Sequence, residues 1–268
     1  MSRPIPPERV RRDSLRPGRV AAALREGLFP RGCALCGKAL AAAEAFYGLC
    51  GPCGERCRPP PDFAAGRCSL CGQPLISEAG TCLSCRNGPP RSFDRALSLF
   101  PYAGKYRTLL RAYKFGGRPE LGNFFTKALE RGMAALGTEN PAWVPVPPRP
   151  GKIKESGWDQ IEYLARILEQ NRRSGGAGAF PVRRCLRRLP SESQKELDRE
   201  ERRRNLQGRI VPAGRNPVLP RPARFPAFPP TAVVFDDVYT TGSTLDACAG
   251  ALKSAGVERV YGICLCYD

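Results

Sequence analysis

Four Cys-x-x-Cys pairs are the first candidates for chemistry in this sequence. They are Cys33/Cys36, Cys50/Cys53, Cys68/Cys71 and Cys82/Cys85. A Cys-x-x-Cys turn points two sulfur atoms at one centre, and two such turns complete a tetrahedral site that suits Zn²⁺. Pairing by proximity therefore predicts two zinc sites with four protein ligands each. Sites that are closed in this way stabilise a fold or hold a partner and do not catalyse.

Disulfides, iron–sulfur ligation and dithiol redox chemistry are the alternatives to zinc. Disulfides do not suit the reducing compartment expected below, and the pairs lack the βαβ setting of a thioredoxin-like pair. Four thiolates also suit an iron–sulfur cluster, which the sequence alone does not exclude. We interpret the pairs as zinc ligands. Cys57, a ninth cysteine in this region, either replaces Cys53 as a ligand or is free, and four later cysteines are interpreted as small buried residues: Cys185, Cys248, Cys264 and Cys266.

A second candidate site follows the apolar run from Thr231 to Phe235, which is typical of a buried strand. Two carboxylates, Asp236 and Asp237, come next, and a hydroxyl-rich turn then opens a helix, with the residues Thr240, Thr241, Gly242, Ser243 and Thr244. Backbone N–H groups and the helix dipole converge at such a turn, which favours a phosphate. The carboxylates can accept hydrogen bonds from vicinal ribose hydroxyls and stabilise Mg²⁺. The pattern predicts a ribose 5-phosphate site, whereas capping a helix would need only one of these residues.

Composition narrows the classes of function. The chain has 268 residues, 13 cysteines and no histidine, so Ser-His-Asp hydrolases and Cys₂His₂ fingers are excluded. Lys and Arg number 43 against 25 Asp and Glu, and the formal charge of +18 favours anionic partners. Every apolar stretch is shorter than the about 18 residues that a membrane-spanning helix needs, and no secretory signal is recognisable. We therefore expect no membrane insertion and a cytoplasmic location.

Predicted strands and helices alternate after about residue 90. These elements must position the candidate site residues. Strands are predicted at 96–100, 142–146, 181–186, 231–235 and 259–266, and helices at 106–113, 119–136, 159–171, 194–204 and 243–254. This alternation favours a parallel α/β sheet. A basic tail with a short helix at 20–28 and the cysteine-rich segment come before this alternating region. A Pro-rich insertion at 212–230 interrupts the region.

The whole chain from about Phe29 to Cys266 resembles the ComF family, which combines a double zinc ribbon with a type I phosphoribosyltransferase-like domain. The Asp236-to-Thr244 segment is similar to the family's phosphoribosyl-diphosphate motif. Further similarity lies in Lys114-Phe115-Gly116-Gly117-Arg118, in Val144-Pro145-Val146-Pro147-Pro148 before the pyrophosphate loop, and in the spacing of Gln194, Leu197, Arg202, Asn205 and Gly208 around a flap.

The resemblance implies an α/β fold with helices on both faces of the sheet. Its predicted parts are a tail at 1–28, a double zinc ribbon at 29–90 and a phosphoribosyltransferase-like domain at 91–268. It implies binding of phosphoribosyl diphosphate or a nucleotide with Mg²⁺, an association with competence and DNA uptake, and catalytic roles for Asp236 and Asp237. The two carboxylates would stabilise a cationic ribosyl transition state as pyrophosphate leaves.

One segment departs from the family. Ser156-Gly157-Trp158-Asp159-Gln160 stands where the family usually reads Arg-Gly-Phe-Asn-Gln. Ser156 removes a cation and Asp159 adds a carboxylate, and both changes weaken the attraction for pyrophosphate. Arg149, Lys152 or Lys154, which lie earlier in the same loop, are expected to compensate.

The alternative to an enzyme is a non-catalytic module that binds single-stranded DNA or competence proteins. Its support is charge, because residues 172–209 hold 12 basic and 5 acidic side chains. Lys and Arg contacts to phosphates give binding that is independent of sequence and sensitive to salt.

Overall fold

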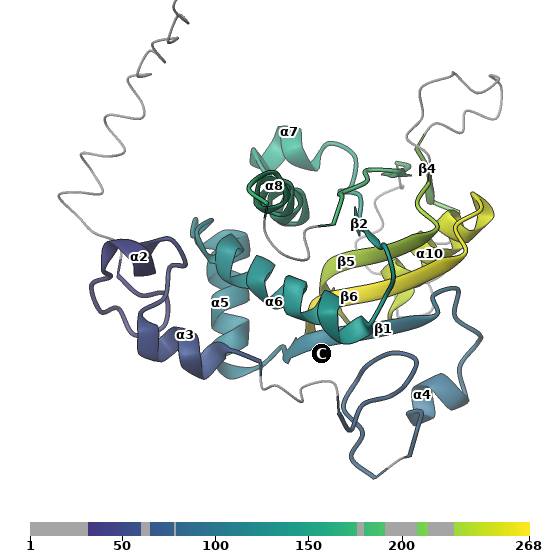
Figure 1. Cartoon of the computed structure of the whole chain (residues 1–268), viewed down its shortest axis with the longest axis horizontal. Coiled ribbons are helices and arrows are strands. Elements are labelled where there is room, and N and C mark those ends of the chain that lie inside the picture. Colours follow the sequence, from purple (N-terminus) through teal and green to yellow (C-terminus); the bar gives the residue numbers. More distant parts are fainter. Residues whose placement is uncertain (1–31, 60–64, 78, 176–179, 191–207, 214–227) are drawn as a thin grey trace, which may run out of the picture.

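A four-stranded parallel sheet is the centre of the computed structural model, which describes residues 32–59, 65–77, 79–175, 180–190, 208–213 and 228–268 (Figure 1). The strands are β1 (Arg95–Pro101), β2 (Ala142–Pro145), β5 (Thr231–Tyr239) and β6 (Arg259–Tyr267). Their order is β1-β6-β5-β2, and all three pairings are parallel. Each strand is apolar on both faces, as expected for a sheet that is covered on both sides.

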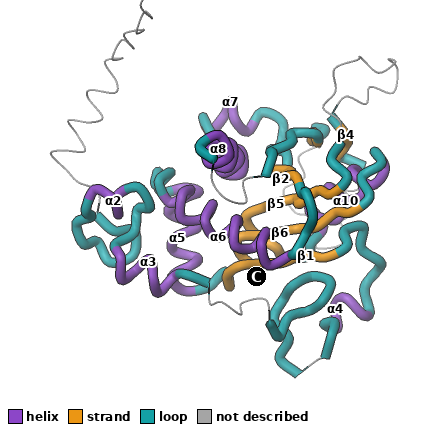
Figure 2. The backbone as a smooth tube through the Cα atoms, viewed as in Figure 1, coloured by secondary structure: helices purple, strands orange, loops and turns teal. Residues whose placement is uncertain are grey.

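Helices cover both faces of this sheet, so the predicted α/β fold is confirmed (Figure 2). Helices α5 (Gly104–Phe115), α6 (Leu121–Leu136) and α8 (Gln160–Arg173) share one core with Leu97, Val233 and Ile263. Helix α10 (Ser243–Ser254) shares the other core with Ala96, Val234 and Val260. These strand residues alternate between the faces because the side chains of a strand do so.

A two-stranded antiparallel sheet packs beside α10. It consists of β3 (Leu186–Arg188) and β4 (Ile210–Pro212), and Leu186 and Ile210 enter the same core as α10. The strand predicted at 181–186 is divided, because Val182 forms an isolated parallel bridge with Trp143 of β2 and the strand proper starts at Leu186. The helices predicted at 20–28 and 194–204 and most of the Pro-rich segment lie outside the described residues.

The cysteine-rich segment forms two units that lie apart in Figure 1. The first contains α2 (Ala42–Ala45) and α3 (Gly51–Cys57) and packs against α5 and α6, with the amide of Asn123 donating to Phe46 O. The second contains α4 (Leu83–Arg86) and contacts β1, where Ala96 N–H donates to Leu70 O at 2.7 Å. The domain boundaries proposed from the sequence stay a prediction.

Every helix within the described ranges is too short or too polar to pass through a lipid bilayer.

Candidate functional site

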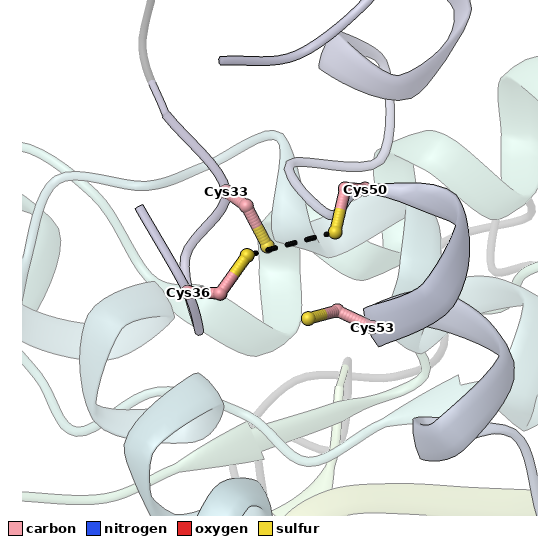
Figure 3. A group of neighbouring side chains, drawn as sticks. All are labelled: Cys33, Cys36, Cys50 and Cys53. Carbon is pink, nitrogen blue, oxygen red and sulfur yellow. Dashed lines mark hydrogen bonds between the residues drawn. The ribbon is translucent and has the colours of Figure 1, made fainter. Parts of the chain in front are cut away.

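The first group of cysteines has the geometry of a tetrahedral metal site. The sulfur atoms of Cys33, Cys36, Cys50 and Cys53 all lie within 4.8 Å of one another, and they converge on one point in Figure 3. Cys36 Sγ and Cys50 Sγ are 3.7 Å apart. A tetrahedron with Zn–S bonds of ~2.3 Å has S–S edges of about 3.8 Å, so this group could hold a zinc ion.

The second group, Cys68, Cys71, Cys82 and Cys85, repeats this arrangement. Its sulfur atoms also lie within 4.8 Å of one another, and Cys71 Sγ is 3.7 Å from Cys82 Sγ. Gly72 closes the first turn with φ +69°, and a Cβ atom there would lie 2.3 Å from Ala96 O. Glycine is therefore required both by the turn and by the close approach of β1.

One thiol in each group is biased toward the thiolate that a metal needs. Burial raises the pKa of Cys33, but the backbone N–H groups of Cys50 and Cys36 outweigh it and lower this pKa to about 6. The same balance of burial against the N–H groups of Cys71 and Cys82 lowers the pKa of Cys68 to about 6. Backbone donors are thus arranged to stabilise negative charge on sulfur.

Cys57 is separate from the first metal group. It is fully buried in the core that the first unit shares with α5 and α6, while Cys53 belongs to the metal group. Arg56 Nη2 donates a hydrogen bond of 3.2 Å to Cys53 Sγ, which offsets part of the charge of the thiolates. The four cysteines interpreted as buried core residues are confirmed as such: Cys185, Cys248, Cys264 and Cys266.

The two carboxylates lie beside the end of a neighbouring strand. Strand β2 ends at Pro145, whose partner on β5 is Phe235, so Asp236 and Asp237 extend beyond β2. The prediction that the strand stops at residue 235 is wrong, because β5 continues to Tyr239, paired with β6. Both residues consequently have β6 as a neighbouring strand on one side and lie past the end of β2 on the other.

The carboxyl ends of β2 and β5 lie at a topological switch point of the sheet. The chain after β2 leads to α8 on one face, and the chain after β5 leads to α10 on the opposite face. When the helices that follow two adjacent parallel strands pack on opposite faces of the sheet, a crevice forms at the carboxyl ends of those strands. Ligands of open α/β sheets bind in such a crevice.

Asp237 is the centre of a polar network in the crevice. Its Oδ2 accepts a hydrogen bond of 2.5 Å from Gln160 Nε2 and lies 2.9 Å from Lys114 Nζ. Gln160 Oε1 in turn accepts from Lys152 Nζ at 2.5 Å. The network thus joins α5, β5, α8 and the short helix α7 (Lys152–Ser156).

Asp236 points toward the α10 side of the sheet. Its Oδ1 accepts the N–H of Asp237 at 2.8 Å. Burial and the neighbouring charge of Asp237 raise the pKa of Asp236 to about 8. The two carboxylates therefore differ, since Asp237 has a cation and an amide donor while Asp236 favours its protonated form.

The predicted phosphate loop is built at the start of α10. Gly242 has φ +75°, and a Cβ atom there would lie 2.4 Å from Tyr239 Oη. The hydroxyls of Thr241 and Ser243 are 2.6 Å apart, and Asp246 N–H donates to Gly242 O at 2.9 Å. Thr240 is exposed and Thr244 is half-buried.

The second cysteine group adjoins this loop. A cavity of about 220 Å³ is lined by Thr240, Thr241 and the cysteines Cys71, Cys82 and Cys85. The phosphate loop and one candidate zinc site are therefore neighbours.

The loop after β2 pairs its cations with its own carboxylates. Arg149 contacts Glu155, and Lys152 Nζ donates to Asp159 Oδ2 at 2.5 Å. Asp159 also caps α8, because its Oδ1 accepts from Ile161 N and Glu162 N at 3.0 and 2.9 Å. Lys152 therefore reaches the network of Asp237, whereas Arg149 is turned toward Glu155.

Lys114 is a residue of the site that sequence reasoning missed, since the motif Lys114-Phe115-Gly116-Gly117-Arg118 predicted no role for it. Helix α5 starts directly after β1 and crosses the carboxyl ends of the strands, so its last turn reaches Asp237. No residue spacing in the sequence predicts that α5 brings Lys114 to Asp237. Asp159, by contrast, carries the familiar signal of an N-cap carboxylate.

A relative found by sequence comparison agrees with the geometry. Competence protein ComFC of Bacillus subtilis (strain 168) is 27% identical over 195 residues, which is 70% of this chain and 72% of that protein. The resemblance to the ComF family is confirmed. No protein-family model matches the chain. The two Cys₄ groups, which could hold zinc ions, fit the double zinc ribbon that this resemblance implies.

Proposed function

We propose that this protein is phosphoribosyltransferase-like and binds phosphoribosyl diphosphate with Mg²⁺ in the crevice beyond β2. The observation that carries the proposal is the position of Asp237. It lies past the end of β2 and in the same strand-turn-helix unit as the glycine turn that opens α10. A diol acceptor and an anion-binding turn on one unit suit a ribose 5-phosphate.

The phosphate would take the N–H groups at the Gly242 turn and the hydroxyls of Thr241 and Ser243. The ribose hydroxyls would donate to the carboxylate of Asp237 and to the carbonyl oxygen of the Asp236 carboxyl group. These are hard oxygen donors of the kind that Mg²⁺ prefers, and Asp237 Oδ2 already accommodates the ammonium of Lys114 at 2.9 Å. The residues present therefore fit a magnesium ion, which would neutralise the charge of the diphosphate when bound.

In a pentosyl transfer, the bond between C1 and pyrophosphate breaks and an acceptor takes C1. The carboxylate of Asp237 would stabilise the positive charge that develops on the ribosyl ring, because it lies close to the ribose hydroxyls in this arrangement. Lys152 and Lys114 would stabilise the negative charge on the leaving pyrophosphate.

The two Cys₄ groups are proposed to hold structural zinc, and the protein to act in the cytoplasm, where thiolates stay reduced. Similarity to a competence protein supports a role in competence and DNA uptake.

Isothermal titration calorimetry with Mg²⁺ and phosphoribosyl diphosphate tests the site. We expect Asp237→Asn to weaken binding by at least about tenfold, since a charged hydrogen-bond acceptor is lost. Glu258→Gln is the matched control, because it removes the same charge from an exposed position that precedes β6, at the amino ends of the strands and therefore far from Asp237. Absence of heat with the wild type at millimolar ligand would refute the proposal.

A non-catalytic DNA- or partner-binding module is the second candidate, supported by the competence relative and the basic charge. It predicts salt-sensitive binding of single-stranded DNA that Asp237→Asn leaves unchanged or strengthens. Gel shifts over a range of salt concentrations, run beside the calorimetry, separate the two functions.

A further inference from the structure

The contacts of Asp237 Oδ2 leave no room for a further partner. Lys114 Nζ and Gln160 Nε2 both contact this one oxygen, at 2.9 and 2.5 Å. A carboxylate oxygen has two lone-pair sites, so a cation or a ribose hydroxyl that approaches Oδ2 must displace one of these two donors.

Gln160 is the donor that is fixed. Its Oε1 accepts from Lys152 Nζ at 2.5 Å, and a carboxylate has no donor while an ammonium has no acceptor, so the orientation of the amide is determined. Its backbone oxygen is held as well, because Tyr113 Oη donates to it at 2.7 Å. Displacement of the Gln160 side chain would therefore break two contacts, those with Asp237 and with Lys152.

Lys114 is the donor that moves more easily, since its ammonium otherwise contacts the ring of the exposed Phe115, at 5.6 Å. It occupies the last turn of α5, its side chain is 22% exposed, and Gly116 and Gly117 follow. A lysine side chain has four rotatable bonds and a compact charge that changes partners readily.

We propose that Lys114 is a ligand-binding residue that exchanges partners. When a divalent cation takes Asp237 Oδ2, the Lys114 ammonium moves onto an anionic oxygen of the diphosphate. This inference rests on the proposed function for the identity of the ligand. The exchange makes binding of the cation and of the anion cooperative. The cation displaces Lys114 from Asp237, and the anion supplies a new partner for the displaced ammonium.

Binding of Mn²⁺ alone, followed by electron paramagnetic resonance, tests the first half of the exchange. Lys114→Met removes the competing ammonium, and we expect Mn²⁺ to bind about tenfold more tightly than to the wild type. Lys127→Met is the matched control, since Lys127 forms an exposed ion pair with Glu130 on α6. Equal Mn²⁺ affinity for Lys114→Met and the wild type would overturn the proposal.

Binding of pyrophosphate in the presence of Mg²⁺, measured by calorimetry, tests the second half. Here Lys114→Met should weaken binding by about tenfold, which is the opposite direction to its effect on Mn²⁺. Lys114→Gln should behave in the same way and serves if the methionine variant does not fold. Unchanged pyrophosphate affinity in a folded variant would overturn the proposal.

These probes separate this inference from the proposed function. A wild type that binds Mn²⁺ and pyrophosphate but not phosphoribosyl diphosphate, with both shifts present in Lys114→Met, would refute the proposed function and support the exchange. Binding of phosphoribosyl diphosphate that does not depend on Lys114 would do the reverse.

Discussion

Asp159 performs two tasks that a pair of substitutions can separate. Its Oδ1 caps α8 through the N–H groups of Ile161 and Glu162, and its Oδ2 holds Lys152. Asp159→Asn retains an oxygen that can cap α8, but it removes the carboxylate oxygen that accepts from the Lys152 ammonium. Asp159→Ala removes both contacts.

The structure sets the expected magnitudes. Loss of an N-cap costs about 1 kcal/mol of folding free energy. The contact with Lys152 contributes about 1 kcal/mol more, at the low end for a charged hydrogen bond, because the lysine side chain is 25% exposed and water can replace part of the contact. We therefore expect Asp159→Ala to cost about 2 kcal/mol in unfolding free energy and Asp159→Asn about 1 kcal/mol.

Urea unfolding with zinc present, followed by tryptophan fluorescence, measures these differences, since Trp158 is adjacent to the cap. Calorimetry with pyrophosphate and Mg²⁺ supplies the second readout. Asn at this position releases Lys152 toward the crevice, so Asp159→Asn should bind pyrophosphate more tightly than the wild type does. Equal destabilisation by the two variants would refute the cap, and weaker pyrophosphate binding by Asp159→Asn would refute the release of Lys152.

Three other outcomes are expected. Elemental analysis should give about two zinc ions per chain, with one lost in Cys53→Ser and none in Cys57→Ser, because only Cys53 belongs to a metal group; iron would contradict this. Gly242→Ala should abolish calorimetric binding of phosphoribosyl diphosphate and lower stability by at least about 1 kcal/mol, since φ is +75° and Tyr239 Oη lies 2.4 Å from the new Cβ; normal binding would show that the turn is not the phosphate site. The pKa of Asp236 is raised to about 8, so its contribution to stability is complete below the unfolded pKa of about 4 and is lost as pH rises to about 8. Unfolding free energies across this range should fall less steeply in Asp236→Asn, and parallel curves would contradict the raised pKa.

Much of the sheet could be predicted because its residues carry local signals. Helix α10 was predicted at its observed bounds, since Gly242 breaks the chain before Ser243 and Gly256 follows the last turn. The end of β5 was not predictable, because Asp236 and Asp237 are poor strand residues. The strand continues there because β6 runs to Tyr267 and supplies a partner for Tyr239.

The candidate site could be predicted only where its residues are close in sequence. Cys-x-x-Cys spacing was enough to identify both metal groups, and the Asp236-to-Thr244 segment is one continuous unit. Lys114 and Gln160 reach Asp237 from two helices more than 75 positions earlier, and no local pattern encodes that approach. For the same reason, the packing of the two cysteine units against different parts of the sheet domain could not be predicted.

The contact between Leu70 and Ala96 has a consequence for solubility. Strand β1 is at the margin of the main sheet, and an uncovered strand there offers its N–H and C=O groups to other chains. The turn of the second cysteine group shields this margin, with Gly72 packed against the backbone of Ala96. A chelator that unfolded this turn would thus free a strand with the apolar sequence Ala96-Leu97-Ser98-Leu99-Phe100, and the chains would then associate edge to edge.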